Sequence, residues 1–332
     1  MNSEASPRPT DRAQPPRYRQ VSIGHPEVEV SQVDGILRMS ALEPLAPMPA
    51  RLLERLEYWA EVRPQQTFIA AREHGGAWRE ISYAEMLRQV RTIAAHLLDL
   101  DLDFGLSAER PLALLSGNDI EHLQIALGAM YAGIPYCPVS PAYALLSQDF
   151  AKLRHVCEVL TPGVVFVSDS QPFQRAIDAV LDPSVAVISV RGVVEGRRTV
   201  DFAALLEPTD LQKADAAFAA TGPDSIAKFL FTSGSTKLPK AVITTQRMLC
   251  ANQQMLLQTF PVFAEEPPVL VDWLPWNHTF GGSHNLGIVL YNGGSFYLDA
   301  GKPTPQGFGE TLRNLREISP TAYLTVPKGW EE

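Results

Sequence analysis

The residues with the clearest chemical character lie in the stretch FLFTSGSTKLPKAVITTQ, residues 229–246. An apolar run leads directly into a loop around Gly234 that carries four hydroxyl side chains: Thr232, Ser233, Ser235 and Thr236. Hydroxyls and backbone amides in such a turn form a concave nest that binds anionic oxygens. Pro239 stiffens the exit of the loop, and Lys240 follows as a fixed cation. The stretch therefore predicts a loop that binds phosphate groups.

This loop is not a Walker phosphate loop. The Walker motif needs a glycine, four residues and then Gly-Lys-Ser/Thr, and the stretch lacks that spacing. A polar surface turn between two strands is the structural alternative, because loops rich in Ser, Thr and Gly are common. The order of TSGST, proline and lysine directly after an apolar strand favours the phosphate-binding interpretation.

The overall charge limits the partners. The 332 residues carry a formal net charge of -9, with a pI near 5.3. This acidic balance argues against a surface for nucleic acid or for an anionic membrane. An acidic protein that takes an anionic substrate must concentrate its few basic groups locally, so the position of each lysine is informative.

The cysteines and the hydropathy indicate the compartment. Cys137, Cys157 and Cys250 are widely spaced, which fits neither a disulfide framework nor a zinc site, and we predict no metal ligands in the chain. The N-terminal residues have no apolar core of a signal peptide, and the least polar stretch, residues 125–139, is interrupted by glycine and proline. We expect a cytoplasmic protein without a membrane span.

The elements that must position the loop are expected to alternate between strands and helices. Residues 1–24 are rich in Pro and Arg and are expected to form a disordered tail, and VEVSQVDGILRMS is expected to form a hairpin. Ser82 is the expected N-cap of a helix, with Glu85 completing a capping box. From residue 111 on, apolar strands alternate with amphipathic helices, which indicates parallel sheets covered by helices on both faces.

We expect two α/β subdomains, residues 25–220 and residues 221–332, joined by the mixed, polar segment 201–222. The second subdomain begins with the strand IAKFLF, which leads into the loop, and ends with an expected strand, TAYLTV. Ligands of parallel sheets sit at the carboxyl ends of the strands, where the loop lies.

The loop resembles the phosphate-binding signature of the adenylate-forming (AMP-binding) superfamily, TSG(S/T)TG, one residue, then PKG. Lys237 and Ala241 stand where that signature usually has glycine. Other resembling segments are TFIAA, SGNDIEHLQIALGAMYAGIPYCPVSPAY and DWLPWNHTFGGSHNLGIVLYNGGSFYLDAGKP, so that the resemblance covers about residue 25 to the end. It implies the large N-terminal domain of such an enzyme, incomplete and without the small C-terminal domain. The chain is therefore interpreted as a fragment of a longer enzyme.

The resemblance also implies ATP, Mg²⁺ and coenzyme A as cofactor and co-substrates, and a small carboxylic acid as substrate. The residues implied to hold the ATP phosphates are Thr232, Ser233, Gly234, Ser235, Thr236 and Lys240. Stabilising the negative charge that leaves with pyrophosphate is the main electrostatic task of such a site. Lys240 is the implied catalytic cation.

His278 matches the histidine that the superfamily places beside the acyl-adenylate, where a neutral imidazole donates a hydrogen bond to developing charge. The alternative is that His278 only caps the helix near Gly281 and Gly282, because a bare histidine is usually not catalytic. His284 is interpreted as structural. Three nearby aromatic residues are candidates for an aromatic-acid pocket or for the core: Trp273, Trp276 and Phe280.

The segments TKLPKAV and DWLPWNHTFGG resemble the feruloyl-CoA synthetase branch of the superfamily. This resemblance implies an acid:CoA ligase for ferulate or a related hydroxycinnamate, of the kind used in aromatic acid catabolism. Two alternatives remain open: a ligase for another aryl or fatty acid, and a non-catalytic remnant that binds ATP, acid or a partner weakly. The oligomeric state is not predicted by the sequence.

Overall fold

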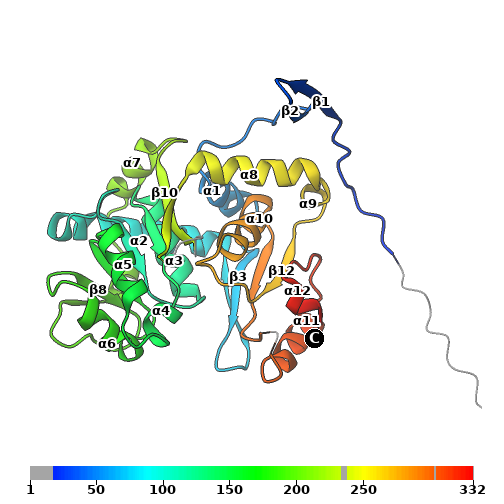
Figure 1. Ribbon diagram of the computed structural model, residues 1–332. Coiled ribbons are helices and arrows are strands. Elements are labelled where there is room, and N and C mark those ends of the chain that lie inside the picture. The colour runs from blue at the N-terminus through cyan, green and yellow to red at the C-terminus, as the bar shows by residue number, and fades with distance from the viewer. Residues whose placement is uncertain (1–17, 233–237, 303, 332) are drawn as a thin grey trace, which may run out of the picture.

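A computed structural model describes residues 18–232, 238–302 and 304–331, and it has two β-sheets packed with helices (Figure 1). The larger sheet has seven strands in the order β11-β10-β6-β5-β7-β8-β9. Every neighbouring pair is parallel except β10 and β11 at one edge. Its strands are β5 (Leu112–Leu114), β6 (Tyr136–Pro138), β7 (Val164–Val167), β8 (Ala186–Ser189), β9 (Thr199–Asp201), β10 (Ile226–Thr232) and β11 (Lys240–Thr245).

The smaller sheet has the order β12-β13-β3-β4, in which only β4 runs antiparallel to its neighbour. Its strands are β3 (Thr67–Arg72), β4 (Trp78–Ser82), β12 (Val269–Asp272) and β13 (Ser295–Leu298). The strands β3 and β4 come early in the chain, whereas β10 and β11 of the larger sheet come late. The expected boundary near residue 220 therefore does not separate the two sheets. The predicted α/β class with mainly parallel sheets is confirmed.

Helices form most of the connections between the strands. They are α1 (Glu54–Val62), α2 (Tyr83–Phe104), α3 (Ile120–Tyr131), α4 (Ala142–Leu145), α5 (Ala151–Leu160), α6 (Ser170–Val180), α7 (Gln212–Ala220), α8 (Gln246–Thr259), α9 (Val262–Glu265), α10 (Leu286–Asn292), α11 (Phe308–Ile318) and α12 (Pro327–Glu331). A 3-10 turn spans Phe202–Leu206, and a π-helix spans Phe280–Asn285 directly before α10.

Local signals set several helix starts. Ser82 Oγ accepts the amide of Glu85 at 3.2 Å, as the capping box predicts, and α2 begins at the next residue. Asp119 caps α3, because its carboxylate accepts the amide of His122 at 2.6 Å. In the same way Thr245 caps α8.

Two hydrophobic cores follow from the period of two along the strands. In β5, Leu112 and Leu114 belong to a large core that also holds β3, α2 and α3, while Ala113 belongs to a second core under α5 and α6. Both faces of the larger sheet are therefore covered, as a parallel sheet requires. The large core joins the two sheets, because it includes Phe68 of β3 and Phe296 of β13.

One expected strand is absent. The segment TAYLTV, residues 321–326, has no strand structure. The amide of Thr321 donates to the carbonyl of Val269 at 3.1 Å, and its hydroxyl accepts the amide of Val269 at 2.8 Å. The Thr321 hydroxyl thus accepts the Val269 amide, which a neighbouring strand would otherwise bond through its backbone carbonyl, and strand pairing with β12 does not continue. The segment is also only half-buried over residues 322–326, whereas a buried strand was expected.

The hairpin of β1 (Val28–Val33) and β2 (Ile36–Ala41) is confirmed, and it projects away from the rest of the chain (Figure 1). Asp34 and Gly35 both have positive φ, 52° and 76°, which is the geometry that an Asp-Gly hairpin turn requires.

Candidate functional site

The predicted phosphate loop connects two hydrogen-bonded strands at the edge of the larger sheet. Thr232 ends β10 and lies opposite Lys240, which begins β11. Both side chains are exposed. Residues 233–237 between them fall outside the described residues, and with them four predicted phosphate-binding positions: Ser233, Gly234, Ser235 and Thr236. Thr232 and Lys240 are thus next to each other, at the carboxyl end of β10, the second strand from the edge of the sheet.

The exit of the loop is fixed by a neighbouring helix. His155 of α5 donates from Nε2 to the carbonyl of Pro239 at 2.9 Å, and Pro239 is buried. This role was not predictable from the sequence, because His155 lies in an amphipathic helix with no partner nearby in the chain. This contact holds the backbone one residue before Lys240.

His278 lies in the turn between β12 and the π-helix. Its side chain is exposed, and its Nδ1 accepts the amide of Phe280 at 3.3 Å. This bond satisfies the first amide of the π-helix, whose N-cap position is the neighbouring Thr279. With Nδ1 as acceptor, the ring proton lies on Nε2, which leaves an N–H donor free for a ligand. Capping and ligand binding are compatible, since they use different ring nitrogens.

The backbone of this turn is held by buried polar side chains. Asn118, just before α3, donates to the carbonyl of Leu274 at 2.8 Å and accepts the amide of Trp276 at 3.0 Å. Asp272 accepts the amide of Leu274 and the amide group of Asn285, both at 2.9 Å. Asp272 thus connects the two ends of the turn. Asn118 attaches the turn to the start of α3, a helix that connects two strands of the larger sheet.

Burial changes the acidity of the carboxyl groups near the turn. Burial raises the pKa of Asp272 from 3.8 to about 6, against the opposing effect of its hydrogen bonds from Leu274 and Asn285. Burial likewise raises the pKa of Asp119 to about 6, although Ser168 and the amide of His122 donate to it. Such shifts cluster at functional sites, but hydrogen-bonded structural carboxylates also show them.

The aromatic candidates separate into core and surface. Trp276 is buried, and its ring packs edge-on against His122 at 5.3 Å and Phe296 at 6.1 Å. It therefore belongs to the core. Trp273 and Phe280 are only half-buried and remain candidates for a pocket wall. His284 is structural as expected, because its ring contacts Asn285 at 2.8 Å and packs against Phe280.

The sequence reasoning missed one buried charge beside the turn. Lys228 of β10 is 2% exposed, and its Nζ donates to the carbonyl of Gly282 in the π-helix at 2.8 Å. The signal was a lysine within the apolar strand IAKFLF. Through this contact the strand that ends in the phosphate loop is attached to the turn that carries His278. The two predicted halves of the site therefore meet at one strand.

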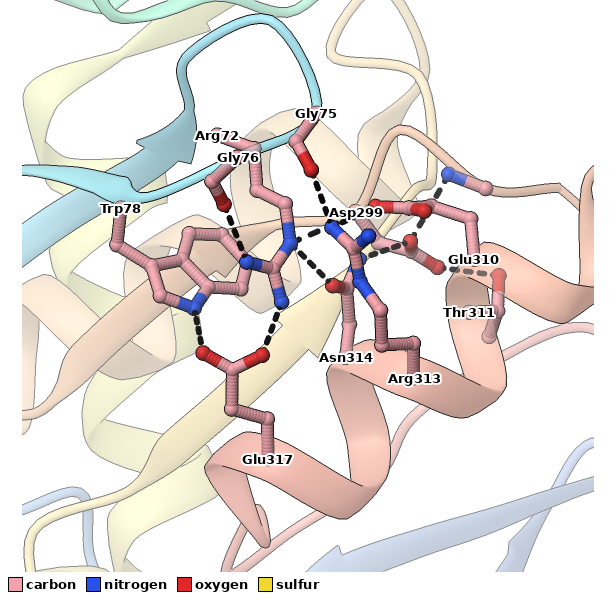
Figure 2. A network of polar contacts seen from close by, with 11 residues as sticks. Arg72, Gly75, Gly76, Trp78, Asp299, Glu310, Thr311, Arg313, Asn314 and Glu317 are labelled. Atoms are coloured by element: carbon pink, nitrogen blue, oxygen red, sulfur yellow. Dashed lines mark hydrogen bonds and ion pairs between the residues drawn. The ribbon is translucent and has the colours of Figure 1, made fainter.

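A second polar network holds α11 against the hairpin of β3 and β4 (Figure 2), and it adjoins this turn, because the amide of Asp299 donates to the carbonyl of Asp272 at 3.0 Å. Arg72 donates to Asn314 Oδ1 and to the carbonyl of Gly76, each at 2.7 Å, and pairs with Glu317. Asp299 accepts hydrogen bonds from Thr311 at 2.6 Å and Asn314 at 2.8 Å. Because these groups satisfy one another, we interpret this network as structural.

Within residues 18–232, 238–302 and 304–331, no group of three or more His, Cys, Asp or Glu side chains is placed to hold a metal ion. None of the helices in this described part of the chain combines the length and the apolar character needed to cross a membrane.

Comparison with known proteins identifies the family. The model of the AMP-binding enzyme family matches residues 56–332, and the chain belongs to that family. A long-chain-fatty-acid–CoA ligase of Mus musculus is 22% identical over 345 residues, which cover 100% of this chain and 46% of the relative. A ligase of Rhodococcus jostii, named 3-[(3aS,4S,7aS)-7a-methyl-1,5-dioxo-octahydro-1H-inden-4-yl]propanoyl:CoA ligase, is 26% identical over 219 residues, covering 64% of this chain and 41% of the relative. The chain thus spans less than half the length of these curated relatives.

Solved structures share the fold. A fatty acyl-adenylate ligase from L. pneumophila, in complex with acyl adenylate and pyrophosphate, has a TM-score of 0.62 at 18% identity, covering 82% of this chain and 44% of that chain. VinN in complex with L-aspartate also has a TM-score of 0.62, at 19% identity, covering 84% of this chain and 69% of that chain.

Proposed function

We propose that the chain is the N-terminal part of an ATP-dependent acid:CoA ligase. Its proposed substrate is an aromatic carboxylic acid, ferulate or a related hydroxycinnamate, which it activates as an acyl-adenylate and transfers to coenzyme A. One observation carries the proposal: in a chain of the AMP-binding family, β10 ends at Thr232 opposite Lys240, and the same strand is bonded to the turn of His278. The three cysteines are unpaired, which supports a cytoplasmic location.

The proposed chemistry has two half-reactions. A carboxylate oxygen of the acid bonds to the α-phosphorus of ATP, the bond from that phosphorus to the bridging oxygen breaks, and pyrophosphate leaves with the electron pair. Lys240 and the loop donors stabilise the leaving charge, and magnesium enters as part of the nucleotide substrate. The thiol of coenzyme A then gives its proton to solvent, its sulfur bonds to the acyl carbon, and the bond from that carbon to the phosphate oxygen breaks, so that AMP leaves with the electron pair. The Nε2–H of His278 donates to an oxygen of the acyl-adenylate.

The acid is the finer part of the proposal. Half-buried Trp273 and Phe280 beside His278 support an aromatic acid. The curated relatives named as long-chain-fatty-acid–CoA ligases make a fatty acid the alternative.

ATP–pyrophosphate exchange tests the proposal, with magnesium and a panel of acids that includes ferulate and long-chain fatty acids. It is measured on the 332-residue chain and on a longer chain that continues past residue 332. We expect exchange that depends on ferulate and falls about 100-fold or more in Lys240→Ala, because a fixed cation on the transferred phosphate contributes on this scale. Lys152→Ala, an exposed lysine of α5, is the matched control and keeps full exchange.

The result of the exchange assay distinguishes the proposed function from its alternatives. Exchange with a fatty acid alone moves the substrate to the alternative. Exchange unchanged in Lys240→Ala rejects the phosphate-loop assignment. No exchange with any acid, in either chain, rejects the ligase proposal and leaves a non-catalytic remnant.

A further inference from the structure

The π-helix after His278 has two side-chain donors on consecutive carbonyls. Lys228 Nζ donates to the carbonyl of Gly282 at 2.8 Å, and Gln253 Nε2 of α8 donates to the carbonyl of Ser283 at 3.1 Å. Both donors are 2% exposed. A π-helical turn is rare and is frequently found at functional sites. Side chains inserted into the hydrogen-bond ladder of a helix are a known cause of such a distortion.

Burying the amino group of Lys228 costs free energy, although it satisfies only one carbonyl. Burial lowers its pKa to about 7, and within the described part of the chain no carboxylate forms an ion pair with it. The ring of Tyr136 lies 5.8 Å from its Nζ, and the adjoining cavity has a volume of only about 20 Å³. An uncharged side chain of similar length would fill the same apolar space without that cost. The contact with Gly282 is therefore the specific contribution of this lysine.

The residue whose carbonyl Lys228 holds is bonded to His278 through its amide. The amide of Gly282 donates to the carbonyl of His278 at 2.9 Å. The turn has no room to relax, because a Cβ at Gly282 would lie 2.1 Å from the carbonyl oxygen of Trp276, and a Cβ at Gly281 would lie 2.6 Å from that of Leu274. A displacement of Gly282 therefore moves the backbone of His278.

We propose that Lys228 and Gln253 are positioning residues: their buried amino and amide groups hold the carbonyls of Gly282 and Ser283, keep the turn in its π-helical form, and so fix the place of His278. This role rests on the proposed function for its effect on catalysis. The geometric part, the hold on the turn, does not depend on it. The two donors come from β10 and α8, the elements that flank the phosphate loop and its exit strand, so the loop and His278 share one support.

The geometric part is tested by amide hydrogen exchange of the variants Lys228→Met and Gln253→Met, which keep the side-chain length and remove the donor. We expect faster exchange in residues 280–287 of each. Tyr83→Phe is the matched control, because the buried Tyr83 hydroxyl contacts the carbonyls of Val289 and Gly294, at 3.2 and 3.0 Å, at the other end of α10. That variant is expected to speed exchange only beyond residue 288. Unchanged exchange in 280–287 for both methionine variants overturns the proposal.

The catalytic part is tested by ATP–pyrophosphate exchange in the longer chain. Lys228→Met is expected to lower kcat about 10-fold or more with an unchanged KM for ATP, since small misplacements of a catalytic group carry such losses. Tyr83→Phe stays within about 2-fold, the range of a change with no contact to the turn. In a His278→Ala background, Lys228→Met is expected to have no further effect, because the lysine acts through the histidine. Full additivity of the two changes overturns that route.

The two failures are distinguishable. If the wild-type chain exchanges with no acid, the proposed function fails, and amide exchange alone decides whether Lys228 and Gln253 hold the turn. If wild-type exchange is robust and Lys228→Met matches it in both assays, the ligase stands and the positioning role is wrong.

Discussion

Single buried side chains near His278 bind the backbone of its turn, and one pair, Asp272 and Asn285, also bonds to each other. Asn118 bonds two backbone groups, Asp272 accepts one backbone amide, and Lys228 holds one carbonyl. Loops normally run over the surface because buried backbone groups need partners. These side chains supply those partners, so the turn is fixed without being part of a strand or a regular helix.

At the same scale, the acidity of Asp272 makes a prediction for stability. Its pKa is about 6 in the folded chain, against 3.8 for the ordinary side chain. Between about pH 4 and 6 the unfolded state loses this proton first, so the free energy of unfolding falls as the pH rises, and it is constant above this range. The shift corresponds to about 3 kcal/mol. Asp272→Asn removes the titration and is expected to gain that much relative to wild type between pH 4 and 7.

Urea unfolding of both chains at pH 4 and 7 measures the difference. Asp119 titrates in the same direction but is present in both chains, so its effect cancels. Parallel stability curves for wild type and Asp272→Asn would show that the carboxyl group is ionised when buried.

At the scale of elements, α11 is attached to the smaller sheet by the network around Arg72 (Figure 2). The Arg72 side chain is 6% exposed and bonds Asn314, Gly76 and Glu317, whereas Arg313 is 46% exposed and bonds Gly75 and Glu310. We expect Arg72→Ala to lower the free energy of unfolding by about 2 kcal/mol, because it leaves Oδ1 of the buried Asn314 without its hydrogen bond. Arg313→Ala, the matched control, costs less than about 1 kcal/mol.

Thermal unfolding and proteolysis of α11 check this pair of variants. The helix is expected to become the first site of cleavage in Arg72→Ala and to stay protected in Arg313→Ala. Equal losses in the two variants would mean that burial of the arginine does not decide its contribution.

The elements also show how far the sequence could predict the structure. Signals that act within a few residues were sufficient: the Asp34-Gly35 turn, the Ser82 cap, and the alternation of apolar strands and helices. Pairing between distant strands was not visible, since nothing local tells β3 that it pairs with β13. The π-helix was missed for the same reason, because its side-chain donors Lys228 and Gln253 come from other elements.

The candidate site was predictable where chemistry is carried by sequence neighbours. Thr232 and Lys240 were expected on either side of one loop, and they are partners across β10 and β11. The contacts that support the site were not predictable, because they join residues far apart in the sequence. His155 bonds Pro239, Asn118 bonds the turn of His278, and Lys228 bonds Gly282 from β10. A lysine inside an apolar strand is the one signal that can direct attention to such a contact in advance.

At the scale of the whole molecule, the hairpin of β1 and β2 differs from the rest. Its pairing puts Val28, Val30, Leu37 and Met39 on one face, and each of them is between 46% and 66% exposed. Below it, the strand-free segment around Gly24 is tightly attached: its amide donates to the carbonyl of Thr259 at 2.8 Å, and a Cβ there would lie 2.3 Å from the carbonyl oxygen of Gln258. The support of the fold in this region therefore lies in the segment around Gly24 and not in the hairpin.

We therefore predict that deleting the hairpin lowers the free energy of unfolding less than adding one methyl group at Gly24 does. The amide of Leu42 donates to the carbonyl of Glu27 at 2.9 Å, so residues 28–41 can be replaced by two glycines without moving the ends. We expect the deletion to change the free energy of unfolding by less than about 1 kcal/mol, as for other exposed positions. Gly24→Ala is expected to cost about 2 kcal/mol, because the added carbon meets backbone that cannot yield. Chemical unfolding of the three chains decides the matter: a deletion that costs more than Gly24→Ala would mean that the hairpin packs on the body in solution, and its apolar face would then be part of the core.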